Sequence, residues 1–99
     1  MWPFSKSVTK NAVRLREVLA QVKQFVDRSE ASGWTPFTPA EISADLSAAI
    51  SRIERNEAID VDRLKMLFAP TGPIQETAMS SGWSDDYLKL SSEFDALTR

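Results

Sequence analysis

The side chains that most often carry out catalysis or hold metals are largely missing from this chain. It contains no cysteine and no histidine. Thiolate nucleophiles, histidine general bases, haem ligation and zinc sites built from these side chains are therefore excluded. No serine lies in a Gly-x-Ser-x-Gly elbow. Lys65 and the carboxylates remain as possible acid or base groups. Their spacing in the sequence does not place any two of them together as a catalytic pair. We therefore predict a protein that is not an enzyme, with no catalytic, metal-binding or cofactor-binding residues.

Two similar segments, Ser32-Gly33-Trp34-Thr35 and Ser81-Gly82-Trp83-Ser84, each carry a tryptophan after a glycine. A glycine that follows a helix, with a large apolar residue after it, is a common helix stop signal. Exposed tryptophans, in contrast, often anchor a protein partner. Both interpretations are open for Trp34 and Trp83.

Acidic residues cluster in the second half of the chain. A first group contains Glu54, Glu57, Asp60 and Asp62, and a second contains Glu76, Asp85 and Asp86. Such clusters can face a basic partner and speed the encounter. They can also be solvated carboxylates that stabilise the first turns of helices. A di-iron site of Glu-x-x-His spacing is excluded because it needs histidine.

Basic residues concentrate at the other end of the chain. Residues 1–28 contain six Lys and Arg against two acidic residues, whereas residues 29–99 contain six against twelve, and the net charge is −2. Lys6, Lys10 and Arg14 fall on one helical row, where intramolecular ion pairs or solvent can compensate them. The alternative is an anionic surface, such as phosphate or lipid. The acidic pI of about 5.1 argues against nucleic acid as a partner.

Helical spacing of apolar residues predicts an all-α fold. The first helix begins near Ser5 or Ser7 and stops at Gly33, and its apolar stripe is Val8, Ala12, Leu15, Leu19, Val22 and Val26. The second begins with Thr38 as N-cap before Pro39, Glu41 completes a capping box, and the helix ends near Asn56. The third begins at Asp60 and ends before Pro70.

Two further helical segments complete the expected fold. Pro70–Pro73 is a predicted rigid connector that leads into a short helical turn over residues 73–81, stopped by Gly82. Ser84 then caps a last helix, with Trp83 and Leu88 as a staple and with Tyr87, Leu90, Phe94 and Leu97 on its apolar face. We expect a single domain, 1–99, resembling a small four-helix bundle with a long N-terminal helix that overhangs the others.

No apolar run approaches the roughly 20 residues that span a bilayer. The first residues also lack the apolar core of a secretory signal, because charges recur from Lys6 onward. We therefore expect a cytoplasmic protein.

The segment from Leu67 to Glu76, LFAPTGPIQE, together with Ser81-Gly82-Trp83, resembles segments of small bacterial all-helical proteins. Some proteins of this size and acidity are immunity proteins that neutralise a toxin. The resemblance implies a bacterial cytoplasmic protein whose activity is binding. The residues that it leads us to test are Trp34, Trp83, Asp60, Asp62, Glu76, Asp85 and Asp86.

Our leading hypothesis is a non-enzymatic protein-binding domain, such as a toxin antagonist, that covers a basic surface of its partner. One alternative is a peripheral membrane or anionic-surface adaptor that uses Lys6, Lys10 and Arg14. Another is a structural homodimer formed through the first helix.

Overall fold

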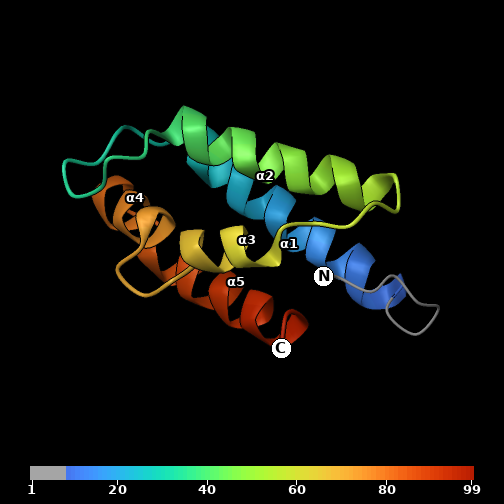
Figure 1. Ribbon diagram of the computed structural model, residues 1–99. Coiled ribbons are helices and arrows are strands. Elements are labelled where there is room, and N and C mark those ends of the chain that lie inside the picture. The colour runs from blue at the N-terminus through green and yellow to red at the C-terminus, as the bar shows by residue number, and fades with distance from the viewer. Residues whose placement is uncertain (1–8) are drawn as a thin grey trace.

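The computed structural model describes residues 9–99, which form helices joined by short connections (Figure 1). The helices are α1 (Thr9–Asp27), α2 (Pro39–Glu54), α3 (Val61–Leu67), α4 (Pro73–Ser81) and α5 (Ser84–Leu97). Within residues 9–99 there is no β-strand. The expected all-helical fold is therefore confirmed.

The long first helix, α1, supplies the centre of the core. It packs mainly on α2 and also on α5, and its predicted stripe is buried: Ala12, Leu15, Leu19, Val22 and Val26, with Val18. The predicted start near Ser5 or Ser7 lies outside the described residues. The predicted end at Gly33 is wrong, because α1 ends at Asp27. After Val26 no apolar residue continues the stripe, and the Ser29 hydroxyl donates a hydrogen bond to the Phe25 carbonyl, which helps to end the helix.

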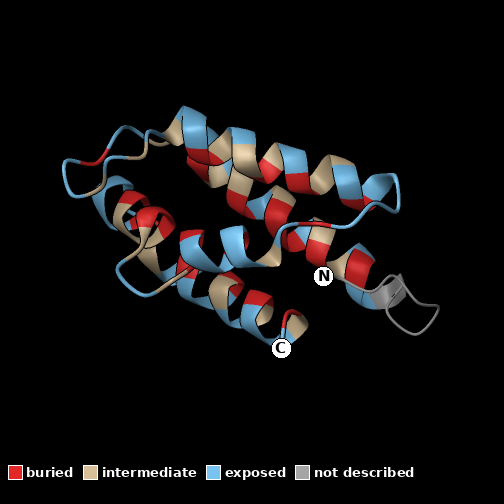
Figure 2. Ribbon diagram, in the orientation of Figure 1, coloured by how far each residue is buried: buried red, intermediate tan, exposed pale blue. Residues whose placement is uncertain are grey.

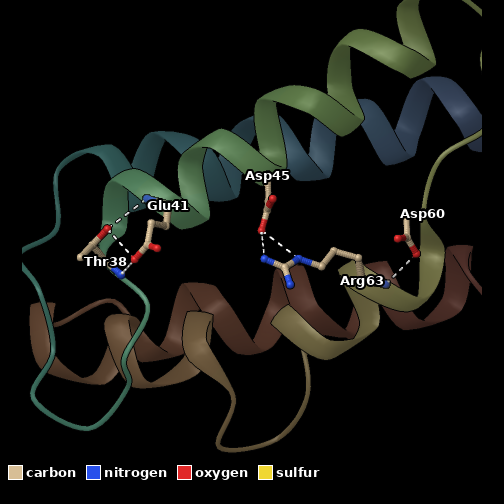
Figure 3. A network of polar contacts seen from close by, with 5 residues as sticks. All are labelled: Thr38, Glu41, Asp45, Asp60 and Arg63. Atoms are coloured by element: carbon tan, nitrogen blue, oxygen red, sulfur yellow. Dashed lines mark hydrogen bonds and ion pairs between the residues drawn. The ribbon is translucent and has the colours of Figure 1, made fainter.

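The start of α2 is the capping box that the sequence predicts (Figure 3). The Thr38 hydroxyl accepts a hydrogen bond from the Glu41 backbone N–H at 3.1 Å, and the Glu41 carboxylate accepts one from the Thr38 N–H at 2.9 Å. Ile42, Leu46, Ala49 and Ile53 then face the core. The helix ends at Glu54, close to the predicted Asn56, which takes a left-handed φ of 55°.

The predicted N-cap of α3 is also confirmed. The Asp60 carboxylate accepts a hydrogen bond from the Arg63 backbone N–H at 3.0 Å, which satisfies one free donor of the first turn. The Arg63 guanidinium reaches across to Asp45 of α2 at 2.8 Å (Figure 3). One face of α3 buries Leu64 and Leu67.

The connector between α3 and α4 is tight. Thr71 has a left-handed φ of 57°, and its backbone N–H donates to the Gln75 side-chain oxygen at 2.6 Å. A Cβ on Gly72 would lie only 2.7 Å from the Ala69 carbonyl oxygen. Only glycine, which has no Cβ, fits at this position without a shift of the backbone.

The boundaries of α4 agree with the sequence, but the start of α5 does not. Proline begins α4 at Pro73, and Gly82 ends it with a φ of 83°. The predicted cap by Ser84 is wrong: the N-cap is Trp83, and no side chain caps this end. The predicted staple fails as well, because Leu88 is 56% exposed while Trp83 packs against α1. Tyr87, Leu90 and Phe94 of α5 are buried as expected.

The molecule is elongated, with extents of 41 × 21 × 20 Å. The first turns of α1 and the last turns of α2 extend beyond α5 in Figure 1. Buried residues line the inner faces of the helices, and the outer faces and the loops are mostly exposed (Figure 2). Within residues 9–99, none of the helices has the length and apolar character that crossing a membrane requires.

Candidate partner-binding site

The two Ser-Gly-Trp segments lie side by side. The Ser80 hydroxyl donates to the Ser32 hydroxyl at 3.0 Å, and the Glu30 backbone N–H donates to the Ser81 hydroxyl at 3.2 Å. Figure 1 shows the loop between α1 and α2 beside the last turn of α4, at one end of the molecule. We call this surface, formed by residues 28–38 and 79–86, the loop end.

Trp83 forms the floor of the loop end and is only 6% exposed. Its ring stacks on Phe25 of α1 with a centroid distance of 4.9 Å, and it meets the Tyr87 ring edge-on at 6.3 Å. The indole N–H donates to the Ser29 hydroxyl at 2.8 Å. Trp83 therefore joins α5 to α1 and has little surface left to offer a partner.

Trp34 has the opposite environment, with 83% of its surface exposed. Its backbone N–H donates to the Ser32 hydroxyl at 3.1 Å. Ser32 is itself buried and also accepts the bond from Ser80. The loop is thus fixed to α4 at the residue two before Trp34, while the indole projects into solvent. A loop held in this way loses little backbone entropy when the side chain that it carries enters a partner's pocket.

Three exposed carboxylates belong to the loop end. Glu30, Asp85 and Asp86 are exposed in or beside the loop end, and Asp85 and Asp86 lie in the first turn of α5. The cation among them, Arg28, has its guanidinium 5.3 Å from the centre of the Phe25 ring. Acidic side chains are in excess at this end, which favours a basic surface as its counterpart.

A shallow pocket of about 340 Å³ opens in the loop end. Its walls are Phe25, Arg28, Ser29, Ser81, Gly82, Trp83 and Asp86. The stacked Phe25 and Trp83 rings give it an apolar base, and the charged groups lie at the rim. Such a pocket can receive one side chain of a partner. Met79 adds an apolar group, 58% exposed, to the last turn of α4.

The other predicted acidic residues lie elsewhere. Asp60 caps α3 and Asp62 is exposed in its first turn, and Figure 1 shows this helix start well away from the loop end. Glu76 is in the first turn of α4, at the opposite end of that helix from Ser81. The structure therefore brings Asp85 and Asp86 to the tryptophans but leaves Asp60, Asp62 and Glu76 apart. Within residues 9–99, no group of three or more carboxylates gathers as a metal site would require.

The basic row of the first helix is described only in part. Lys6 lies outside the described residues, and the side chain of Lys10 is not described. The Arg14 guanidinium is bound to the Glu93 carboxylate of α5, with an Nε–O distance of 2.8 Å. This hydrogen bond from Arg14 to Glu93 raises the pKa of Arg14 above its ordinary value. Intramolecular pairing thus compensates Arg14, and the anionic-surface alternative rests on Lys6 and Lys10.

Sequence reasoning missed Glu30, Arg28 and Met79 as members of the loop end. Met79 follows the buried Thr77 and Ala78, so helical spacing alone already puts it on the outer face of α4. No comparable signal marks Glu30 and Arg28, because their neighbours at the loop end come from a distant part of the chain. No family model matches the chain, and no curated protein or solved structure was found to be similar to it.

Proposed function

We propose that this protein is a non-enzymatic protein-binding domain whose loop end covers a basic surface of a partner protein. The observation that carries the proposal is Trp34: its indole is 83% exposed, although the loop that bears it is held by the buried Ser32. Single apolar side chains are common on protein surfaces, so the proposal rests on the combination of the exposed ring with a loop that is held in place. Tryptophan is also one of the residues that most often dominate binding energy at interfaces.

The charges around Trp34 support a basic partner. Glu30, Asp85 and Asp86 can attract it over a distance, and Trp34 then contributes by burial in an apolar pocket. In this proposal the four longer helices form a small bundle-like scaffold that holds the loop end, and binding requires no conformational change. As a biological role we propose neutralisation of a basic toxin in the bacterial cytoplasm, in the manner of an immunity protein.

The test compares three tagged forms of the full chain in the native host: wild type, Trp34→Ala and Val13→Ala. Val13 is the matched control, because it is also an exposed apolar residue, at 48%, but lies near the start of α1, whereas the loop end follows the other end of that helix. We expect wild type and the Val13 variant to retain one basic protein at fixed stoichiometry. The Trp34 variant should lose it, with unchanged thermal stability.

Two results would contradict the proposal. One is an absence of any stoichiometric partner with the wild type. The other is a partner that the Trp34 variant retains as well as the wild type does. Addition of salt provides an independent measure, since an electrostatically steered complex associates more slowly as ionic strength rises.

A further inference from the structure

A second surface, on the face formed by α3 and α5, contains a groove of about 640 Å³. Its walls are the residues Lys65, Phe68, Ala69, Pro70, Gln75, Tyr87, Leu88, Ser91, Asp95, Thr98 and Arg99. It runs along α5 from Tyr87 to Arg99, a length of roughly 18 Å at the rise of an α-helix. None of these residues is among those that the sequence predicts to bind a partner.

The floor of the groove is apolar and already formed. Phe68 and Tyr87 are buried, their rings stack at 6.4 Å, and Phe68 stacks in turn on Phe94 at 4.1 Å. The Tyr87 hydroxyl donates to the Phe68 carbonyl at 2.9 Å. Burial raises the pKa of this hydroxyl, which therefore keeps its proton and its hydrogen bond. A floor fixed in this way needs no rearrangement before a ligand binds.

Leu88 makes the wall on the α5 side apolar as well. It is 56% exposed, one residue after the buried Tyr87. The groove is partly open to solvent, so it suits the side of a helix or peptide better than an enclosed small molecule.

The charges of the groove differ from those of the loop end. The charged residues of its lining are Lys65 on α3, Arg99 after α5 and Asp95 on α5. Neither cation belongs to an ion pair formed among the described side chains. The groove thus carries a local excess of positive charge on a protein whose net charge is −2. An occupant that complements it has an apolar stripe flanked by carboxylates.

We propose that this groove binds an acidic amphipathic helix of about three turns, contributed by a partner protein. The apolar stripe of that helix lies over Leu88, Ala69 and Pro70, the apolar residues of the lining that are exposed or half-buried. Its carboxylates bind Lys65 and Arg99. The linings of this groove and of the loop-end pocket have no residue in common, and the groove selects the opposite charge.

The test titrates the full isotope-labelled chain with a synthetic peptide of about 12 residues, with leucines at helical spacing and glutamates elsewhere. A second peptide with lysines in place of the glutamates serves as the charge control. We expect the NMR signals of Leu88, Ser91 and Thr98 to shift with the acidic peptide and to stay in place with the basic one. The signals of Trp34 should not move.

Variants separate the groove from general electrostatic attraction. Lys65→Glu and Leu88→Asp should each weaken binding of the acidic peptide by about tenfold or more, and Lys65→Arg should retain it. Lys89→Glu is the matched control, because Lys89 is also an exposed lysine but lies outside the groove, and it should change the affinity by less than about twofold. Thermal unfolding of each variant shows whether its fold is intact.

The proposal is overturned if the acidic peptide shifts no groove signal at millimolar concentration. It is equally overturned if Lys89→Glu weakens binding as much as Lys65→Glu, or if both peptides bind alike. None of these outcomes bears on Trp34, so the function proposed for the loop end is judged separately.

Discussion

The segments 32–35 and 81–84 have nearly the same sequence and opposite environments. Trp83 is almost completely buried, whereas Trp34 is mostly exposed. The difference begins with the glycines, because Gly82 takes a left-handed φ of 83° and Gly33 does not. One sequence pattern thus gives a core residue in one place and an exposed residue in the other.

The cause is what precedes each segment. Gly82 directly follows α4, and the Trp83 backbone N–H donates to the Ala78 carbonyl at 2.9 Å, the bond that turns a chain back over the end of a helix. This turn aims the Trp83 ring at Phe25. Gly33 comes several residues after the end of α1, so there is no helix for it to close. The Ser-Gly-Trp pattern therefore forms a helix C-cap only where the glycine directly follows a helix.

The largest expected effect is that of Trp83→Ala. This change removes the ring that stacks on Phe25 and packs on Tyr87, and it should lower the free energy of unfolding by about 3–5 kcal/mol. Trp34→Ala removes an exposed ring and should change it by less than about 0.5 kcal/mol. Denaturant unfolding measures both. Equal losses would show that Trp34 packs against the protein after all.

Ser29→Ala should cost less, about 1–3 kcal/mol, because it leaves the buried Trp83 indole N–H without its acceptor. In a Trp83→Phe background the N–H is already gone, and the same serine change should then cost markedly less. The double-mutant cycle measures this coupling by denaturant unfolding. Additive losses would mean that Ser29 acts through its bond to the Phe25 carbonyl alone.

The two glycines can be compared directly. Gly82→Ala forces a side chain into the left-handed region and should destabilise the protein by about 1–2 kcal/mol. Gly33→Ala meets nothing within 4 Å and requires no such conformation, so its effect should stay within about 0.5 kcal/mol. Thermal unfolding distinguishes them, and a costly Gly33→Ala would contradict the contrast drawn between the segments.

The smallest expected effect is one of pH on the loop that carries Trp34. Hydrogen bonds from Lys23 and then Ser43 lower the pKa of Asp27 from its ordinary value of 3.8. The charged carboxylate therefore stabilises the folded state above that value, and this contribution is lost as the pH falls through the lower folded pKa. The bond from Ser43 to Asp27 ties α2 to the end of α1, across the base of the Trp34 loop.

Acidification should consequently loosen the amides of residues 30–36 before the Trp83 indole signal changes. Hydrogen exchange followed by NMR measures this order. In Asp27→Asn the loop should exchange faster already at neutral pH, with no further step on acidification. Simultaneous loosening of the loop and Trp83 would show that Asp27 does not act locally.

Features with a local cause could be predicted from the sequence. Thr38 and Glu41 satisfy each other within one turn, Asp60 caps the turn that follows it, and Gly82 ends the helix next to it. None of these needs a distant residue. The helix starts and stops at these positions were accordingly confirmed.

Features with a distant cause could not be predicted. The Ser84 cap and the Leu88 staple failed because Phe25 of α1 takes up the Trp83 ring. The path of the loop after α1 could not be predicted either, because Glu30 and Ser32 are held by serines at the end of α4, which no spacing reveals. The grouping of Trp34 with Asp85 and Asp86, rather than with Asp60, likewise follows from how the helices pack.

The close contact between Gly72 and the Ala69 carbonyl has a consequence for proteins related to this chain by descent. A carbonyl only 2.7 Å from where a Cβ would stand forbids any bulkier substitute in every descendant that keeps this corner. Exposed residues change readily during evolution, and the sequence identity between relatives falls as they do. We therefore expect glycine at this position in any relative that keeps the same corner between α3 and α4.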